Sequence, residues 1–166
     1  MKHLKTILLA TALCIGTVSF TQAQSKVAHI NTQELIAAMP AAKAAQAELE
    51  TLGKTYQTDI QASITEYQNT VKQYEAEAAT KTDEENQKRG LELQEKQQRI
   101  QQFRADAQKH LAEKEAELFE PIQKEAMEAI NEVAKAQGYQ YVLDRTTLIV
   151  ANGKDILADV KKQLGI

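Results

Sequence analysis

The side chains best suited to metal binding are two of the three histidines of this chain, and these two lie far apart. His29 falls in a short segment typical of a strand, and His110 lies within a long helical stretch. A zinc site needs three or four convergent ligands, and paired histidine ligands often follow an HxxxH or HExxH spacing, which does not occur here. We therefore expect no metal site, and we interpret His29 as a packing or partly exposed strand residue.

Carboxylates are abundant, but their spacing is that of a solvated helix surface. Glu92 and Glu95 precede Lys96 and Arg99 by one helical turn each, and such pairs support an exposed helix. The sequence has no glycine-rich phosphate loop and no nucleophile elbow. Enzyme sites also need concave and largely apolar pockets. We therefore expect no enzymatic activity and no cofactor.

The first 23 residues have the pattern of a secretory signal peptide. Lys2 and Lys5 precede an apolar stretch over residues 7–20, and the segment ends in Thr21-Gln22-Ala23, which suits signal peptidase. A membrane anchor is the alternative, but the stretch 7–20 is too short for this, because a bilayer span needs about 20 apolar residues. Cys14, the single cysteine, lies inside this segment, so the mature chain would lack disulfides and thiolate chemistry.

Removal of that segment makes the chain more acidic than its full-length net charge of −3. It leaves 18 basic and 23 acidic side chains, a net charge of −5. A protein that grips nucleic acid or an anionic membrane surface needs the opposite charge. We therefore expect neither partner.

Residues 41–137 form a helical stretch too long to fold into an ordinary globule, so we expect it to project as an arm. Thr82 and Glu85 fit a capping box, which predicts a turn near residues 80–82 and an antiparallel hairpin. Large apolar residues recur at steps of three and four along the first helix, which predicts a single narrow seam. These residues are Leu49, Leu52, Tyr56, Ile60, Ile64, Tyr67, Val71 and Tyr74.

The returning helix carries a thinner apolar pattern and a middle rich in glutamine. The glutamines are Gln87, Gln94, Gln97, Gln98, Gln101, Gln102 and Gln108. Such a stripe usually packs against its partner helix, but a seam this weak could leave apolar surface free to hold unfolded chains. We take the region toward the tip as the freer part, with seven candidate client-binding residues: Tyr67, Val71, Tyr74, Leu91, Leu93, Ile100 and Phe103.

The two prolines of the chain, Pro40 and Pro121, fall at the same level if the chain reverses near residue 81. We interpret them as a hinge where the arm leaves its base, with a helix kink near residue 121. An incidental kink in a tolerant helix is the alternative.

The segments 24–40 and 138–166 predict a small β-rich body. Strands are expected at 26–30, 139–144 and 148–151, with a helix capped by Asn31 or Thr32 and a final helix capped by Asp155. Gly138 should end the long helix. Three short strands leave open edges, so we expect self-association. The candidate residues are Val27, Ile30, Tyr141, Val142, Leu143, Leu148, Ile149 and Val150.

Together, Lys26 to Thr32, the long hairpin and the stretches 141–144 and 154–160 resemble the Skp/OmpH family over nearly the whole mature chain. The resemblance implies an α+β, mainly α fold in which strands of three chains form a β-barrel body and three arms surround a cavity. It implies a periplasmic, ATP-independent holdase for unfolded outer-membrane proteins. Family members known for this role are basic, so the acidic charge here argues against a lipopolysaccharide site. The alternative function is a structural coiled-coil spacer or adaptor of the cell envelope.

Overall fold

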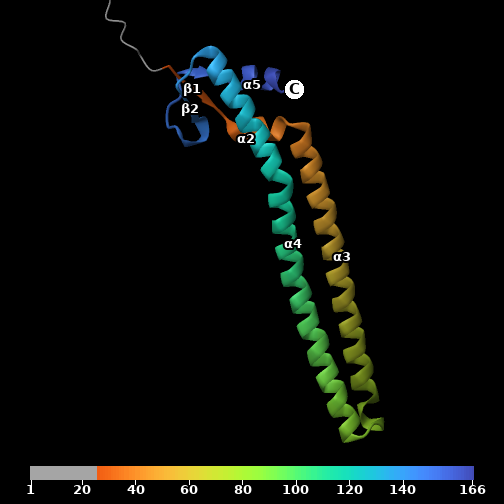
Figure 1. The fold of residues 1–166 in the computed structure, drawn as a ribbon. Coiled ribbons are helices and arrows are strands. Elements are labelled where there is room, and N and C mark those ends of the chain that lie inside the picture. The colour runs from red at the N-terminus through yellow and green to blue at the C-terminus, as the bar shows by residue number, and fades with distance from the viewer. Residues whose placement is uncertain (1–25) are drawn as a thin grey trace, which may run out of the picture.

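The computed structural model describes residues 26–166, so the predicted signal peptide lies outside the described residues. Figure 1 shows two long helices that run side by side from a small body containing the strands and two short helices. The predicted α+β, mainly α class with a long helical hairpin is confirmed. In order, the elements are β1 (Val27–Ile30), α2 (Thr32–Ala38), α3 (Pro40–Glu77), η1 (Ala78–Thr80), α4 (Asp83–Gln137), β2 (Tyr141–Asp144), η2 (Arg145–Thr147), β3 (Lys154–Asp155) and α5 (Leu157–Gln163).

The arm consists of α3 and α4, and the chain reverses between them through η1. Thr82 caps α4 by accepting a hydrogen bond from the Glu85 N–H, and the Glu85 carboxylate accepts one from the Thr82 N–H. The predicted capping box is therefore confirmed. All eight predicted seam residues of the first helix are half-buried, and most polar residues between them are exposed. The seam is real, but two helices alone do not bury it.

Local signals set the other helix ends. Asn31 caps α2 by accepting a hydrogen bond from the Glu34 N–H. Pro40 is the first residue of α3, where its missing N–H costs no helix hydrogen bond. Gly138 ends α4 with a φ of 71°, a left-handed conformation that glycine adopts without strain. Pro121 lies inside α4, and the hinge at the two prolines stays a prediction.

The sheet of the body is parallel, with the order β2-β1-β3. The predicted strand at Leu148 to Ala151 is wrong, because the third strand is instead β3 at Lys154–Asp155. Both edges of β1 are occupied by β2 and β3, so the β-branched segment 148–151 finds no strand edge on β1. Its residues Ile149 and Val150 are exposed.

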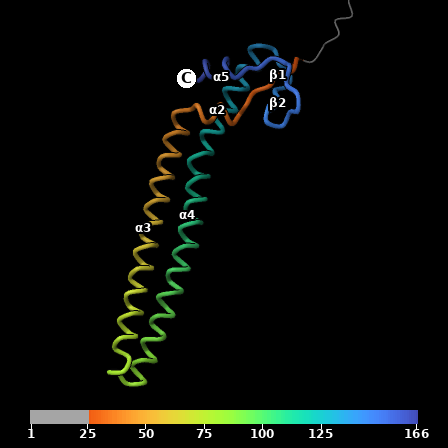
Figure 2. Tube along the Cα trace, turned by 180° about the vertical axis from the view of Figure 1, so that it is seen from behind, coloured from red at the N-terminus to blue at the C-terminus, as the bar shows by residue number. Residues whose placement is uncertain are grey.

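The core lies where the sheet, α2, α5 and the last turns of α4 meet, at the top of the arm (Figure 2). Its fully buried large side chains are Ile30, Leu35, Ile156 and Val160. The sequence predicts Asp155 as the cap of the last helix, but the N-cap is Ile156. Asp155 precedes the N-cap by one residue, and its carboxylate accepts a hydrogen bond from the Leu157 N–H. Within residues 26–166, the helices are either too short or too polar to cross a lipid bilayer.

Candidate functional site

The predicted client-binding residues fall into two groups. Six of them lie half-buried in the seam between α3 and α4: Tyr67, Val71, Tyr74, Leu93, Ile100 and Phe103. Leu91 lies outside the seam, with 56% of its surface exposed. The Leu91 side chain is therefore openly accessible, whereas most of the other side chains are accessible only at the edges of the seam.

One shallow groove crosses the middle of the arm and brings three of the predicted residues together. Tyr67 of α3 and Ile100 and Phe103 of α4 form its apolar part. Val71, Tyr74 and Leu93 do not line it. The remaining lining residues are Ser63, Glu66, Lys96 and Arg99.

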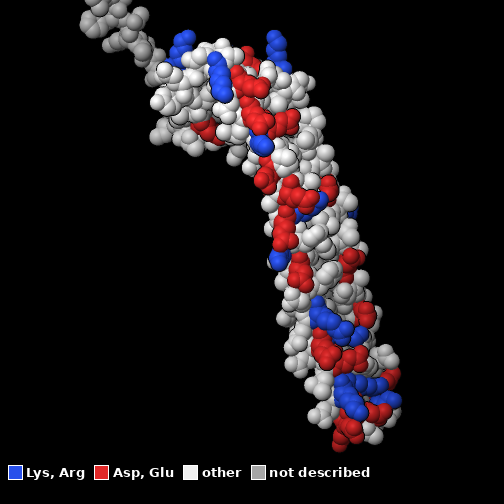
Figure 3. All heavy atoms as spheres, viewed as in Figure 1, with Lys and Arg blue, Asp and Glu red and all other residues white. Residues whose placement is uncertain are grey.

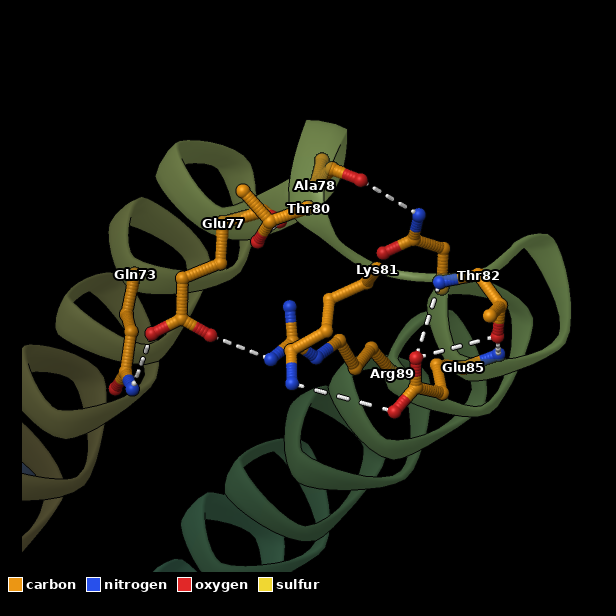
Figure 4. Close-up of polar contacts among 9 residues, drawn as sticks. Gln73, Glu77, Ala78, Thr80, Lys81, Thr82, Glu85 and Arg89 are labelled. Carbon is orange, nitrogen blue, oxygen red and sulfur yellow. Dashed lines mark hydrogen bonds and ion pairs between the residues drawn. The ribbon is translucent and has the colours of Figure 1, made fainter.

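Polar contacts close the tip of the arm (Figure 4). The Glu77 carboxylate accepts hydrogen bonds from Gln73 at 3.0 Å and from Arg89 at 2.5 Å, and these two donors hold its pKa below the usual range. The Arg89 guanidinium also lies 4.5 Å from the centre of the Tyr74 ring, a cation–π contact. The Tyr74 hydroxyl donates to Glu92 at 2.6 Å, which raises the Tyr74 pKa. The tip is thus joined more by charge than by apolar burial.

Further polar pairs join the two helices below the tip. Lys96 donates to Glu66 at 2.9 Å, and this contact lowers the pKa of Glu66 and raises that of Lys96. The Tyr56 hydroxyl lies 2.7 Å from His110 Nδ1. Exposed pairs of this kind contribute little stability, but their geometry favours one register of the hairpin. Sequence reasoning missed them, although charged residues at seam positions were a visible signal.

The body exposes several apolar side chains in and after its strands. Of the eight candidate self-association residues, Val27, Tyr141, Leu143, Ile149 and Val150 are exposed, Val142 and Leu148 are half-buried, and Ile30 is buried. Val27 and Tyr141 are register partners in β1 and β2. Within residues 26–166, β2 and β3 pair with β1 alone, so each retains an open edge.

Asp144 joins the end of β2 to the start of α2. Its carboxylate accepts hydrogen bonds from the Thr32 hydroxyl and from the Thr146 N–H and hydroxyl. These donors, Thr32 first among them, hold the pKa of Asp144 below its usual value. These contacts hold the end of β2 and the start of η2 against the start of α2.

His29 is a packing residue, as expected. It is buried, and its Nε2 lies 3.2 Å from the Gly153 carbonyl oxygen. Across the described residues, histidine, cysteine and carboxylate side chains nowhere gather in a group of three that could hold a metal ion.

Comparison with known proteins gives a consistent match. The family described as outer membrane protein (OmpH-like) matches residues 26–164. The chain is 26% identical to the chaperone protein Skp of Pectobacterium atrosepticum, over 92% of this chain and 93% of that protein. It is 27% identical to Skp of Photorhabdus luminescens, over 86% and 87% of the two chains.

A solved structure supports the same fold. A candidate outer membrane chaperone (OmpH-like) from Caulobacter crescentus CB15 superposes with a TM-score of 0.76 over 86% of this chain and 85% of that one. Sequence identity in this pair is 23%, so the likeness shows the fold alone.

Proposed function

This chain belongs to the family of OmpH-like outer membrane proteins, and we propose that it is an ATP-independent holdase that binds unfolded outer-membrane proteins and prevents their aggregation. Two relatives over most of its length are Skp chaperones. We place its action in the periplasm, after export by the signal peptide predicted at residues 1–23.

The observation that carries this proposal is the construction of the arm. Between Ala45 and Ile122, Ala107 is the one described residue that is buried, so the arm has almost no interior. Such a helix pair leaves nearly all of its side chains at least partly exposed to a partner. A chaperone that holds many different clients without ATP needs this kind of large surface with many weak contacts.

The second part of the proposal is a homotrimer whose strands form a small barrel. The exposed Val27, Tyr141 and Leu143, together with the 148–151 segment, supply apolar surface beside two open strand edges. Pairing those edges between copies would remove the aggregation hazard of an open sheet. Three arms would then surround a cavity for the client, with Pro40 and Pro121 as the hinge of each arm.

Within the arm, we assign client contact to the groove residues Tyr67, Ile100 and Phe103, to the exposed Leu91, and to Val71, Tyr74 and Leu93 where the seam is open. The acidic balance of the mature chain gives no reason to include lipopolysaccharide or an anionic membrane among the partners.

Light scattering tests the proposal. A porin unfolded in urea is diluted into buffer with increasing amounts of the chain, and scattering is followed over time. We expect suppression at about one trimer per porin, with no ATP present. Undiminished scattering at a large excess would contradict the holdase function and favour the spacer or adaptor. Sedimentation of the same sample tests the trimer, since a stable monomer would refute the assembly.

A further inference from the structure

A stripe of uncharged residues runs along the exposed surface of α4. It contains the glutamines Gln87, Gln94, Gln98, Gln101 and Gln108, which recur at steps of seven, four and three residues. Leu91, Ala105 and Ala112 fill the remaining steps. Residues at this spacing share one face of a helix. All eight are exposed, so they face solvent and not α3.

The absence of charge distinguishes this stripe from the rest of the exposed surface of α4 over residues 87–112. Residues 87–112 include nine charged side chains, all of them among the 18 positions outside the stripe. Figure 3 shows uncharged surface between groups of charged side chains along the arm. Half of the surrounding positions are therefore charged, whereas none of the eight stripe positions is.

The stripe glutamines also have free amides. Gln73 and Gln102, by contrast, use theirs within their own helices, where Gln73 donates to Glu77 and Gln102 to Asp106. Among the hydrogen bonds of residues 26–166, none involves the side chain of a stripe glutamine. Each of these amides therefore offers two N–H donors and a carbonyl acceptor to a partner.

We propose that this stripe, named the glutamine stripe, binds the backbone of an extended, unfolded polypeptide. A peptide group carries one N–H donor and one C=O acceptor, and a glutamine amide complements both, whatever side chains the client has. The inference rests on the proposed holdase function, and it assigns part of the client contact to backbone recognition. It also explains why the outer face of α4 carries amides in place of charges, which would favour clients of one sign.

The dimensions fit such a partner. From Gln87 to Gln108 the helix rises about 31 Å, at 1.5 Å per residue. An extended chain covers about 3.4 Å per residue, so a segment of roughly nine residues would lie along the stripe. A second copy of the helix is a poorer partner, because a helix–helix seam needs leucine, isoleucine or valine at these positions, and the stripe has Leu91 alone.

The test uses two fluorescent peptides with the same uncharged side chains, one of which carries N-methyl groups on alternate backbone nitrogens. Binding is measured by anisotropy for the full chain, for Gln94→Ala/Gln98→Ala/Gln101→Ala, and for the control Gln57→Ala/Gln61→Ala/Gln68→Ala on α3. The control glutamines are also exposed, but Lys54 and Lys72 flank them at the same helical spacing, so they form no uncharged surface of the same length. Alanine is a better helix former than glutamine, so circular dichroism should show both variants folded.

We expect the unmethylated peptide to bind the full chain about fivefold to tenfold more tightly than the methylated one, as a few hydrogen bonds would give. The α4 variant should lose this preference, and the α3 control should keep it. Equal binding of the two peptides, or equal loss in both variants, would overturn the inference. Absence of binding would overturn it too, and the scattering assay then shows whether the holdase function fails with it.

Discussion

The stability of the molecule should depend on the small body and hardly at all on the apolar residues of the arm surface. Two leucines provide a matched test of this. Leu35 of α2 is completely buried, with 0% of its surface exposed, whereas Leu91 of α4 is 56% exposed. Leu35→Ala and Leu91→Ala remove the same atoms from these two environments.

The expected magnitudes follow from burial. Deletion of a fully buried leucine side chain loses its transfer free energy and leaves a cavity, which together cost about 3–5 kcal/mol. Since small domains are stable by only about 5–15 kcal/mol, Leu35→Ala should remove a large part of the free energy of unfolding. An exposed substitution of this kind changes it by about 0.5 kcal/mol or less, so Leu91→Ala should unfold like the parent chain.

Urea unfolding followed by circular dichroism at 222 nm measures both variants. It should be repeated at several protein concentrations, because self-association stabilises the folded state by mass action. Leu91→Ala should retain stability but bind unfolded porin more weakly. Similar losses of stability in the two variants would refute the view that the body holds the core and the arm only displays surface.

Three further outcomes are expected. Thr82→Ala removes the capping box with Glu85 and should lower the free energy of unfolding in urea by about 1 kcal/mol, with faster hydrogen exchange in the first turn of α4. Unchanged stability and unchanged exchange in that turn would contradict the role of the cap. Asp144→Asn removes a carboxylate whose pKa is depressed, so its stabilising effect should be present above the unfolded-state pKa and disappear as pH falls through the lower folded-state value; a constant difference across a pH series of unfolding curves would refute this. Pro121→Ala restores a helix N–H and should stabilise the chain by up to about 3 kcal/mol. The variant should also hold a narrower size range of clients, and a range equal to that of the parent chain would contradict the hinge.

Local chemistry could be predicted from the sequence wherever a few neighbouring residues decide the conformation. Asn31, Thr82 and Gly138 each end or begin a helix with their own side chain or backbone, so their roles depend on nothing distant. The apolar seam of α3 was equally visible, because helical spacing alone places its residues on one face.

The strand expected at 148–151 shows that local sequence does not reveal which segments pair in a sheet. Its β-branched residues favour extended backbone, but a strand also needs a free edge to pair with. The central strand β1 uses both of its edges for β2 and β3, and nothing in segment 148–151 reveals that.

The polar contacts between α3 and α4 were not predicted from the sequence, for a related reason. Glu66 and Lys96 are 30 residues apart, and their contact depends on the register between α3 and α4. Pairing residues about the turn near Thr82 would have indicated the contact, since Tyr74 and Glu92 are related in the same way. The sequence shows that α4 is rich in glutamine. Only the structure shows that the glutamines of the glutamine stripe are exposed and that their amides form no hydrogen bonds within the described residues.

Hydrogen exchange on the complete chain, with and without an unfolded porin, tests the central claim most directly. If the arm holds the client, bound porin should slow amide exchange within residues 41–137, most strongly along the α4 surface from 87 to 112, and leave α5 unchanged. The porin itself should exchange as an unfolded chain. Protection confined to the body, or none at all at saturating porin, would contradict the account.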